Sequence, residues 1–197
     1  MLDCSPAKIH EYRARYGADL WQLRTPLTKY ALAGVPYGLE NGCFGGFIPP
    51  AWERLLEEAE ESRPVFVTVP DVVGDAQRTA ELFEHYQLRL NGLPRALVLQ
   101  NGIERVRIPW NDIVGVFIGG DDAFKVSREA FAAARTARML GKWVHVGRVN
   151  TAARCQAWLG IAHSLDGSGV SRFDHMLEDV LRMIEGDHPQ QQLPVGA

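Results

Sequence analysis

Six points along this 197-residue chain place polar groups or paired glycines directly after a short apolar run. A carboxylate can attack a carbon or move a proton, an amide can read a hydrogen-bonding edge, and paired glycines let a ligand approach the backbone. Asp166 lies between small residues in Ser-Leu-Asp-Gly-Ser-Gly, and we interpret it as a nucleophile. The six points are Glu40, Asp71, Gln100, Gly119-Gly120, the segment from His145 to Arg148, and Asp166.

Each of these points, taken alone, also has an ordinary structural explanation. Asp71 stands near a helix start, although Asp75 is the better N-cap. Gln100 precedes Asn-Gly, which is a strong turn signal, and Gly119-Gly120 fits a turn that needs positive φ. His145 lies inside a predicted strand, where a core histidine is the commoner interpretation than a catalyst.

The elements that must position these groups alternate between helices and apolar strands. The patterns predict helices at 6–16, 49–62, 75–90, 127–140, 151–159 and 173–184, and strands at 19–24, 36–41, 64–70, 96–99, 114–118, 143–146 and 161–165. Such alternation predicts an α/β chain with a parallel sheet. We expect a trimmed TIM-type (β/α)8 barrel with about seven clear strand–helix units, whose strand ends meet at one rim.

An open doubly wound sheet is the alternative fold. No GxGxxG or Walker motif follows a predicted strand, which disfavours its nucleotide-binding version. Residues 1–186 are expected to form a single barrel domain. Residues 187–197 are rich in Pro, Gln and Gly and predict a disordered tail.

Composition narrows the class of protein. A net charge of -3 and a pI near 6.1 argue against indiscriminate nucleic-acid binding, but they leave room for a local basic patch. The chain has no apolar run long enough to span a bilayer and no signal-peptide pattern at its start. Cys4, Cys43 and Cys155 lack metal-type spacing, and their odd number disfavours a disulfide framework. We therefore expect a cytoplasmic protein without a metal, a cofactor or a membrane partner.

Six short blocks of sequence, in order from residue 39 to residue 169, carry a family resemblance. They are Glu-Asn-Gly-Cys-Phe (40–44), Val-Pro-Asp-Val-Val-Gly-Asp-Ala (69–76), Leu-Val-Leu-Gln-Asn-Gly (97–102), Val-Phe-Ile-Gly-Gly (116–120), Trp-Val-His-Val-Gly-Arg-Val-Asn (143–150) and Ser-Leu-Asp-Gly-Ser (164–168). Together they resemble the tRNA-guanine transglycosylase superfamily, most closely the DNA-acting branch that installs 7-deazaguanine bases.

The resemblance implies roles for two catalytic carboxylates. Asp166 matches the residue that attacks C1′ of the target nucleotide and forms a covalent glycosyl ester. Glu40 stands where the family has a general acid/base, usually the shorter Asp. Two such carboxylates make chemical sense, because retaining glycosidases exchange a glycosidic bond in the same way.

The resemblance also implies a base-binding set. Asp71 would accept from N1–H and the exocyclic amine of guanine, while Gln100 and the backbone N–H of Gly120, in the Gly119-Gly120 pair, would donate to O6. Two further side chains would sandwich the purine plane, namely Phe44 and Val146. A buried acceptor facing a donor edge rejects adenine, since adenine would leave polar groups unpaired.

The family's tRNA-acting members carry a Cys/His zinc site after the last strand, and no cysteine follows Asp166 here. The expected partner is therefore DNA rather than tRNA, together with a purine or 7-deazaguanine base. Candidates for phosphate contact are Lys125, Arg148, Arg154 and Arg172. The short chain also leaves open a second copy or another subunit that completes the nucleic-acid groove.

We therefore expect a glycosyltransferase that replaces guanine in DNA with a 7-deazaguanine such as preQ0. Two alternatives remain at this stage. One is a nucleosidase or base-excising hydrolase that uses the same site with water as the acceptor. The other is a catalytically silent subunit that binds a purine or nucleic acid.

Overall fold

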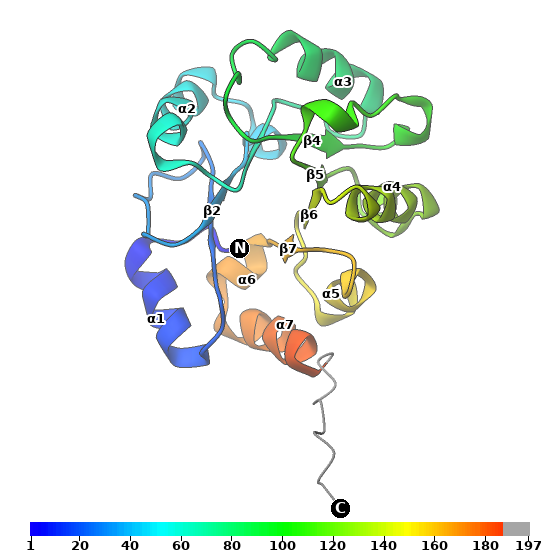
Figure 1. Cartoon of the computed structure of the whole chain (residues 1–197). Coiled ribbons are helices and arrows are strands. Elements are labelled where there is room, and N and C mark those ends of the chain that lie inside the picture. The colour runs from blue at the N-terminus through cyan, green and yellow to red at the C-terminus, as the bar shows by residue number, and fades with distance from the viewer. Residues whose placement is uncertain (187–197) are drawn as a thin grey trace, which may run out of the picture.

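Seven parallel strands form one curled sheet in the computed structural model, which describes residues 1–186 (Figure 1). The sheet curls into a half-barrel, and its strands follow one another in chain order without a reversal. A doubly wound sheet reverses its order at a switch point, so this alternative is wrong. The strands are β1 Gln22–Arg24, β2 Tyr37–Leu39, β3 Phe66–Thr68, β4 Arg95–Leu99, β5 Gly115–Ile118, β6 Trp143–Val146 and β7 Ser164–Leu165.

Strand register aligns the carboxyl ends of the last four strands. Leu99 pairs with Ile118, Ile118 with Val146, and Val146 with Leu165. The residue that follows each strand therefore stands beside the residue that follows the next strand. These adjacent positions are Gln100, Gly119, Gly147 and Asp166.

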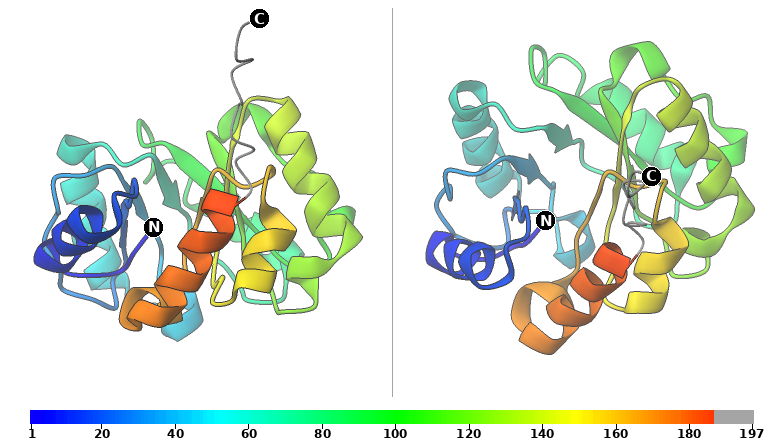
Figure 2. Two further views of the ribbon diagram at one scale, coloured as in Figure 1. Left: turned by 90° about the horizontal axis from the view of Figure 1, so that it is seen from below. Right: turned by 60° about the horizontal axis from the view of Figure 1, so that its bottom comes forward.

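Helices pack around the outside of the curled sheet (Figures 1 and 2). Side chains of Ser5, Asp75, Ser127 and Thr151 accept from backbone N–H groups at four helix N-termini, as capping chemistry predicts. The helices are α1 Pro6–Tyr16, α2 Pro49–Ser62, α3 Ala76–His85, α4 Arg128–Met139, α5 Ala152–Trp158, α6 Ser168–Arg172 and α7 Asp174–Gly186. Short 3-10 turns are η1 Cys43–Gly45, η2 Ile103–Arg105, η3 Trp110–Asp112 and η4 Phe124–Val126.

Two helical features differ from the sequence-based expectation. Helix α3 ends at His85 rather than at residue 90, and the chain continues in turns to Gly92, which has φ 83°. Helix α6 was not predicted, because its Ser-Gly-Val-Ser-Arg sequence has low helix propensity. It begins directly after Gly167, so the candidate nucleophile lies just before a helix start.

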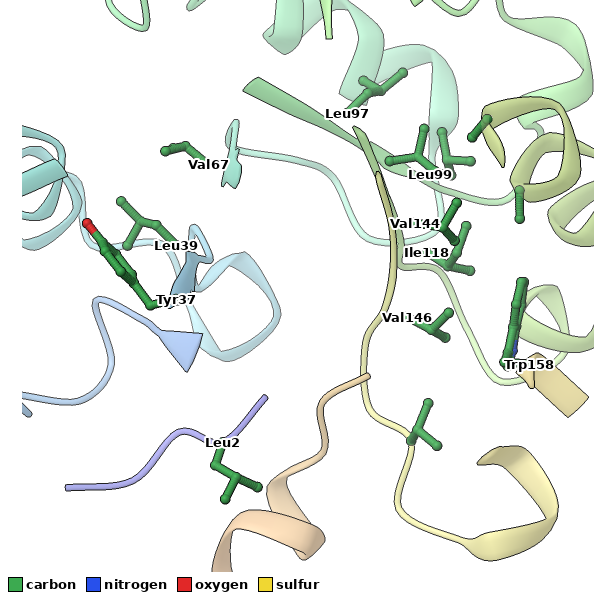
Figure 3. Close-up of a cluster of buried hydrophobic side chains, with 14 of the residues drawn as sticks. Leu2, Tyr37, Leu39, Val67, Leu97, Leu99, Ile118, Val144, Val146 and Trp158 are labelled. Carbon is green, nitrogen blue, oxygen red and sulfur yellow. The ribbon is translucent and has the colours of Figure 1, made fainter. Parts of the chain in front are cut away.

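Successive residues of each strand face two different cores, as the period of a strand requires. The outer core lies between the sheet and the helices and includes Leu39, Leu97 and Val146 (Figure 3). The inner core fills the concave side of the curled sheet with Leu23, Phe66, Ala96, Val98 and Phe117. An open pocket can therefore form only above this inner core, at the carboxyl end of the sheet.

The first two residues lie between the two edge strands of the sheet. The backbone nitrogen of Met1 donates to the carbonyl of Leu165 in β7. On the other side, Leu2 N–H donates to Trp21 O at 2.8 Å, and Leu23 N–H donates to Leu2 O at 2.9 Å. Residues 1–2 thus connect β7 to β1 by backbone hydrogen bonds.

Within the described residues, no helix is both long and apolar enough to cross a membrane. The predicted tail at 187–197 lies outside the described residues.

Candidate active site

A pocket opens at the carboxyl ends of the strands, where the sequence predicted a rim of polar groups. Its volume is about 430 Å³ when the open space at its mouth is included. Side chains from the ends of β2, β3, β4, β5, β6 and β7 contribute to it. Of the predicted residues, the pocket is lined by Glu40, Phe44, Asp71, Gln100, Gly119, Gly120, Lys125, Arg148 and Asp166.

Asp166 follows β7 and is held by two donors on the same oxygen. Its Oδ1 lies 3.1 Å from His145 Nε2 and accepts from the backbone N–H of Arg148 at 3.0 Å. Burial alone would raise its pKa, since the side chain is only 12% exposed. The bonds from His145 and Arg148 outweigh burial and hold the pKa of Asp166 below its ordinary value. The carboxylate is therefore ionised at neutral pH.

The tautomer of His145 follows from its other partner. Trp143 Nε1 can only donate, and it lies 2.9 Å from Ser164 Oγ. Ser164 is then free to donate its own proton to His145 Nδ1 at 2.8 Å. Because burial lowers the pKa of His145, the imidazole is neutral and carries its proton on Nε2. It therefore donates to Asp166.

His145 is thus both a core residue and a site residue. Its ring is fully buried, with centroids 5.0 Å from Phe66 and 4.6 Å from Phe117. Sequence reasoning favoured the core role and did not connect His145 or Ser164 to Asp166. The available signal was two polar residues inside adjacent apolar strands, at positions that the strand register pairs.

Glu40 follows β2 and lines the same pocket as Asp166. Its backbone N–H donates to Arg24 O at 2.8 Å, which extends the β1–β2 pairing by one residue. Burial, and then the negative charges of Asp166 and Asp71, raise the pKa of Glu40 to about 8. Glu40 is therefore largely protonated at neutral pH, whereas Asp166 is ionised.

Asp71 follows β3 and is fixed by two amides. Asn41 Nδ2 donates to Oδ1 at 2.8 Å, and Gln100 Nε2 donates to Oδ2. Burial raises the pKa of Asp71, against the opposing effect of these hydrogen bonds. The Cys43 thiol and the backbone N–H of Asp71 also donate to this carboxylate, while Gln100 Nε2 has a second hydrogen besides the one that Asp71 accepts. The pair can therefore present an acceptor and a donor to one ligand edge.

Asn41 is a supporting residue that the sequence analysis did not single out. Its backbone N–H donates to Thr68 Oγ1 at 2.9 Å, its Nδ2 also donates to Val69 O at 2.6 Å, and its Oδ1 accepts from Cys43 N–H at 2.7 Å. These bonds tie the end of β2 to the end of β3. They also fix the start of the turn that carries Phe44.

The Gly119-Gly120 pair is required by its neighbours as well as by any ligand. A Cβ on Gly119 would lie 2.7 Å from Val98 Cγ1 and 2.9 Å from Gln100 Nε2. Gly120 has φ 69°, and a Cβ there would lie 2.4 Å from the Phe124 ring. The pair therefore lets Gln100 and the turn after Gly120 pack closely beside the pocket.

The structure corrects one of the two side chains that were expected to sandwich a purine ring. Phe44 is 57% exposed at the pocket mouth, as a stacking platform requires. Val146 is fully buried in the outer core, on the side of β6 that faces the helices, and it does not line the pocket (Figure 3). Val146 therefore cannot stack on a base in this pocket, and this part of the prediction is wrong. Arg148 covers one face of the Phe44 ring, with its guanidinium carbon 3.9 Å from the ring centre, so these two side chains contact each other.

Two of the four predicted phosphate contacts line the pocket, namely Lys125 and Arg148. Arg154 lies behind them and donates to Asp122 Oδ1 at 3.0 Å and to Arg148 O at 3.3 Å. Arg172 is exposed at the end of α6 and does not line the pocket. The side chain of Lys125 is buried in the pocket lining.

Residues 1–186 contain no group of three or more His, Cys, Asp or Glu side chains placed to hold a metal ion.

Comparison of the chain with models of known protein families and with curated protein sequences gives no match. The resemblance to transglycosylases therefore depends on the six sequence blocks alone.

Proposed function

We propose that this protein is a base-exchanging glycosyltransferase that replaces guanine in DNA with a 7-deazaguanine base. The observation that carries the proposal is that two carboxyl groups from different strand ends line one pocket, Asp166 held by His145 and Arg148 and Glu40 buried, with the pKa raised at Glu40 and lowered at Asp166. Paired carboxyl groups displaced in this way serve as acid and nucleophile in glycosidic chemistry.

The proposed reaction has two half-reactions. Asp166 Oδ attacks C1′ of the target nucleotide, the bond from C1′ to the base nitrogen breaks, and protonated Glu40 gives its proton to the departing guanine. The incoming base then gives its N9 proton to the Glu40 carboxylate. Its nitrogen attacks C1′ and releases Asp166, so the configuration at C1′ is retained.

The other end of the pocket supports a guanine-like ligand. Guanine presents two adjacent donors, N1–H and the exocyclic amine, beside the acceptor O6. Asp71 offers carboxylate oxygens and Gln100 offers an N–H, held together by their mutual hydrogen bond. Adenine has neither donor in that arrangement and would give Asp71 no further hydrogen bond.

We further propose that the half-barrel is a trimmed (β/α)8 barrel in which residues 1–2 take the place of one strand. Their hydrogen bonds to both edge strands support this assignment. In such barrels the catalytic groups lie at the carboxyl ends of the strands, where this pocket opens.

The experiment is base exchange followed by nucleoside mass spectrometry. A guanine-containing DNA oligonucleotide and a matched RNA are incubated with the protein and preQ0. We expect the deazaguanine nucleoside in DNA, none with Asp166→Asn, and wild-type levels with Asp179→Asn, whose carboxylate is exposed on α7. A covalent protein–oligonucleotide adduct should form with the wild type and with Asp179→Asn, and should be absent with Asp166→Asn.

Other outcomes assign the site differently. Incorporation only into RNA would replace DNA as the acceptor. Release of free guanine without incorporation would assign a hydrolase. Purine binding without turnover, unaffected by Asp166→Asn, would indicate a silent binding subunit and overturn the proposal.

A further inference from the structure

Lys125 is a buried cation in the pocket for which the proposed reaction has no use. Its side chain is only 1% exposed, and it lines the pocket. Among the described residues, no hydrogen bond or ion pair reaches its Nζ, and Nζ is not one of their fully enclosed unpaired nitrogens, so it is open to the pocket. An isolated buried ammonium is costly, so a position of this kind calls for an anion or a strong acceptor from a ligand.

The sequence around Lys125 holds it in place. Asp121 Oδ1 accepts from Phe124 N–H at 2.7 Å, and Asp121 Oδ2 accepts from Asn101 Nδ2 at 2.9 Å. The Phe124 ring packs over Gly120, where only a glycine fits. The turn η4 is therefore a rigid support that presents Lys125 beside Gly120, rather than a loose surface segment.

A second cation lies close to Lys125. Desolvation lowers the pKa of Lys125 to about 8, and the next cause is the positive charge of Arg148. Arg148 also lines the pocket, above the Phe44 ring. Two neighbouring cations repel each other, and a negative or electron-rich group between them would relieve that repulsion.

Burial indicates which part of a substrate meets Lys125. The phosphates of a nucleic acid stay with the backbone at the mouth of a pocket, while the extruded base is the part that enters. Lys125 is nearly inaccessible to solvent, so a group on the base fits better than a phosphate. O6 and position 7 of a purine lie on the same edge. If Gly120 donates to O6, the turn that follows it faces position 7.

We propose that Lys125, with Arg148 beside it, selects an incoming base that carries a hydrogen-bond acceptor or a negative charge at C7. A carboxylate or nitrile accepts a hydrogen bond from the ammonium. A positively charged aminomethyl group is repelled by both cations. This inference rests on the proposed function, because it places a 7-deazaguanine in the pocket.

The test measures binding of four free bases by calorimetry, without any exchange reaction. The bases are 7-deazaguanine and its 7-carboxy, 7-cyano and 7-aminomethyl derivatives. We expect the carboxy and cyano bases to bind at least about tenfold more tightly than the unsubstituted base, since each gives Lys125 a partner. The aminomethyl base should bind more weakly than the unsubstituted base.

Variants separate recognition by Lys125 from a structural role. Lys125→Met should abolish the preference for the carboxy base over 7-deazaguanine, because it removes the charged contact. Lys125→Glu should reverse the order and favour the aminomethyl base. Lys142→Met is the matched control, since Lys142 Nζ bonds Ile113 O at the opposite end of β6. It should keep the wild-type order.

The outcomes also distinguish this inference from the proposed function. If the four bases bind in the expected order but no base exchange occurs, the specificity role of Lys125 is supported and the proposed transglycosylase activity is overturned. Equal affinities for the four bases would overturn the role of Lys125, and so would an equal loss of affinity for all four in Lys125→Met. Neither result would affect the proposed base-exchange reaction. A third outcome is tighter binding of 2′-deoxyguanosine monophosphate than of 2′-deoxyguanosine, with the difference lost in Lys125→Met. It would show that Lys125 binds a phosphate on the sugar rather than a group on the base, and it would overturn this inference as well.

Discussion

His145 and Asp166 meet from adjacent strands, with Nε2 3.1 Å from Oδ1, so the candidate nucleophile is oriented by a neutral imidazole. The proton on Nε2 is fixed by Ser164 and Trp143 further inside the sheet. The inner core of the sheet therefore sets the protonation state of the residue at its rim.

Removing the His145 donor should slow base exchange. His145→Leu deletes a hydrogen bond to a charged group, worth about 1.5–3 kcal/mol, or roughly 10- to 100-fold in rate. The pKa of Asp166 should rise, so the acid limb of the pH–rate profile should move to higher pH. His145→Gln, which can keep an N–H near the Nε2 position, should restore part of the rate. An unshifted acid limb in His145→Leu would contradict the positioning role.

Glu40→Gln should change the pH dependence of stability. In the wild type the folded-state pKa is raised from 4.5 to about 8, so the folded state binds more protons than the unfolded state between these values. The free energy of unfolding of the wild-type protein should therefore fall as pH rises through this window, by up to about 1.4 kcal/mol per pH unit. Glu40→Gln should remove this fall, as measured by urea unfolding at pH 5 and pH 8.

The control for that measurement is Glu61→Gln, because Glu61 is exposed on α2. It should keep the wild-type slope. Exchange activity of the wild type should also decline above pH 8, where Glu40 loses the proton that it gives to the departing base. Activity that rises steadily through pH 9 would exclude Glu40 as the acid.

Gln100→Ala should weaken recognition of the base. Gln100 donates to Asp71 and accepts from Gly74 N–H at 2.9 Å, so its loss frees the carboxylate and the loop after β3. We expect guanine affinity to fall about tenfold or more, and discrimination against adenine to shrink, because a buried polar contact is lost. Gln77→Ala, on the exposed face of α3, should change neither affinity. Equal guanine and adenine affinities already in the wild type would remove the recognition role.

Arg148→Gly should move stability and base affinity in opposite directions. Arg148 has φ 62°, a conformation that costs an L-residue roughly 1 kcal/mol and a glycine very little. The free energy of unfolding should rise or stay constant, while base affinity should fall because the pocket loses the guanidinium that lines it. Thermal unfolding and base titration measure the two effects. Unchanged base affinity would show that Arg148 does not contribute to base binding.

Phe44→Ala should weaken base binding by about 1–3 kcal/mol, the range measured when an aromatic platform is removed from a stacked base. Phe44→Trp should retain binding because it keeps a π-face. The control is Phe173→Ala, an equally exposed phenylalanine that does not line the pocket. Loss of binding in both alanine variants would point to a general effect on folding.

The sequence by itself determined the order of the elements and the rim of the sheet. Apolar runs and capping residues such as Ser127 are local signals, and they predicted the seven strands and most helix bounds. Residues directly after strands must gather at one end of a parallel sheet, so Glu40, Asp71, Gln100 and Asp166 were placed at one pocket by topology alone.

Tertiary structure decided what those residues touch. Val146 was assigned to the wrong face of β6, because successive residues of a strand face opposite sides and His145 occupies the concave face. Arg148 lies at the pocket mouth against Phe44. The pairing of His145 with Asp166 and the burial of Lys125 join segments far apart in sequence. Proton affinity depends on desolvation and on neighbouring charges, so the opposite pKa displacements of Glu40 and Asp166 exist only once the chain has folded.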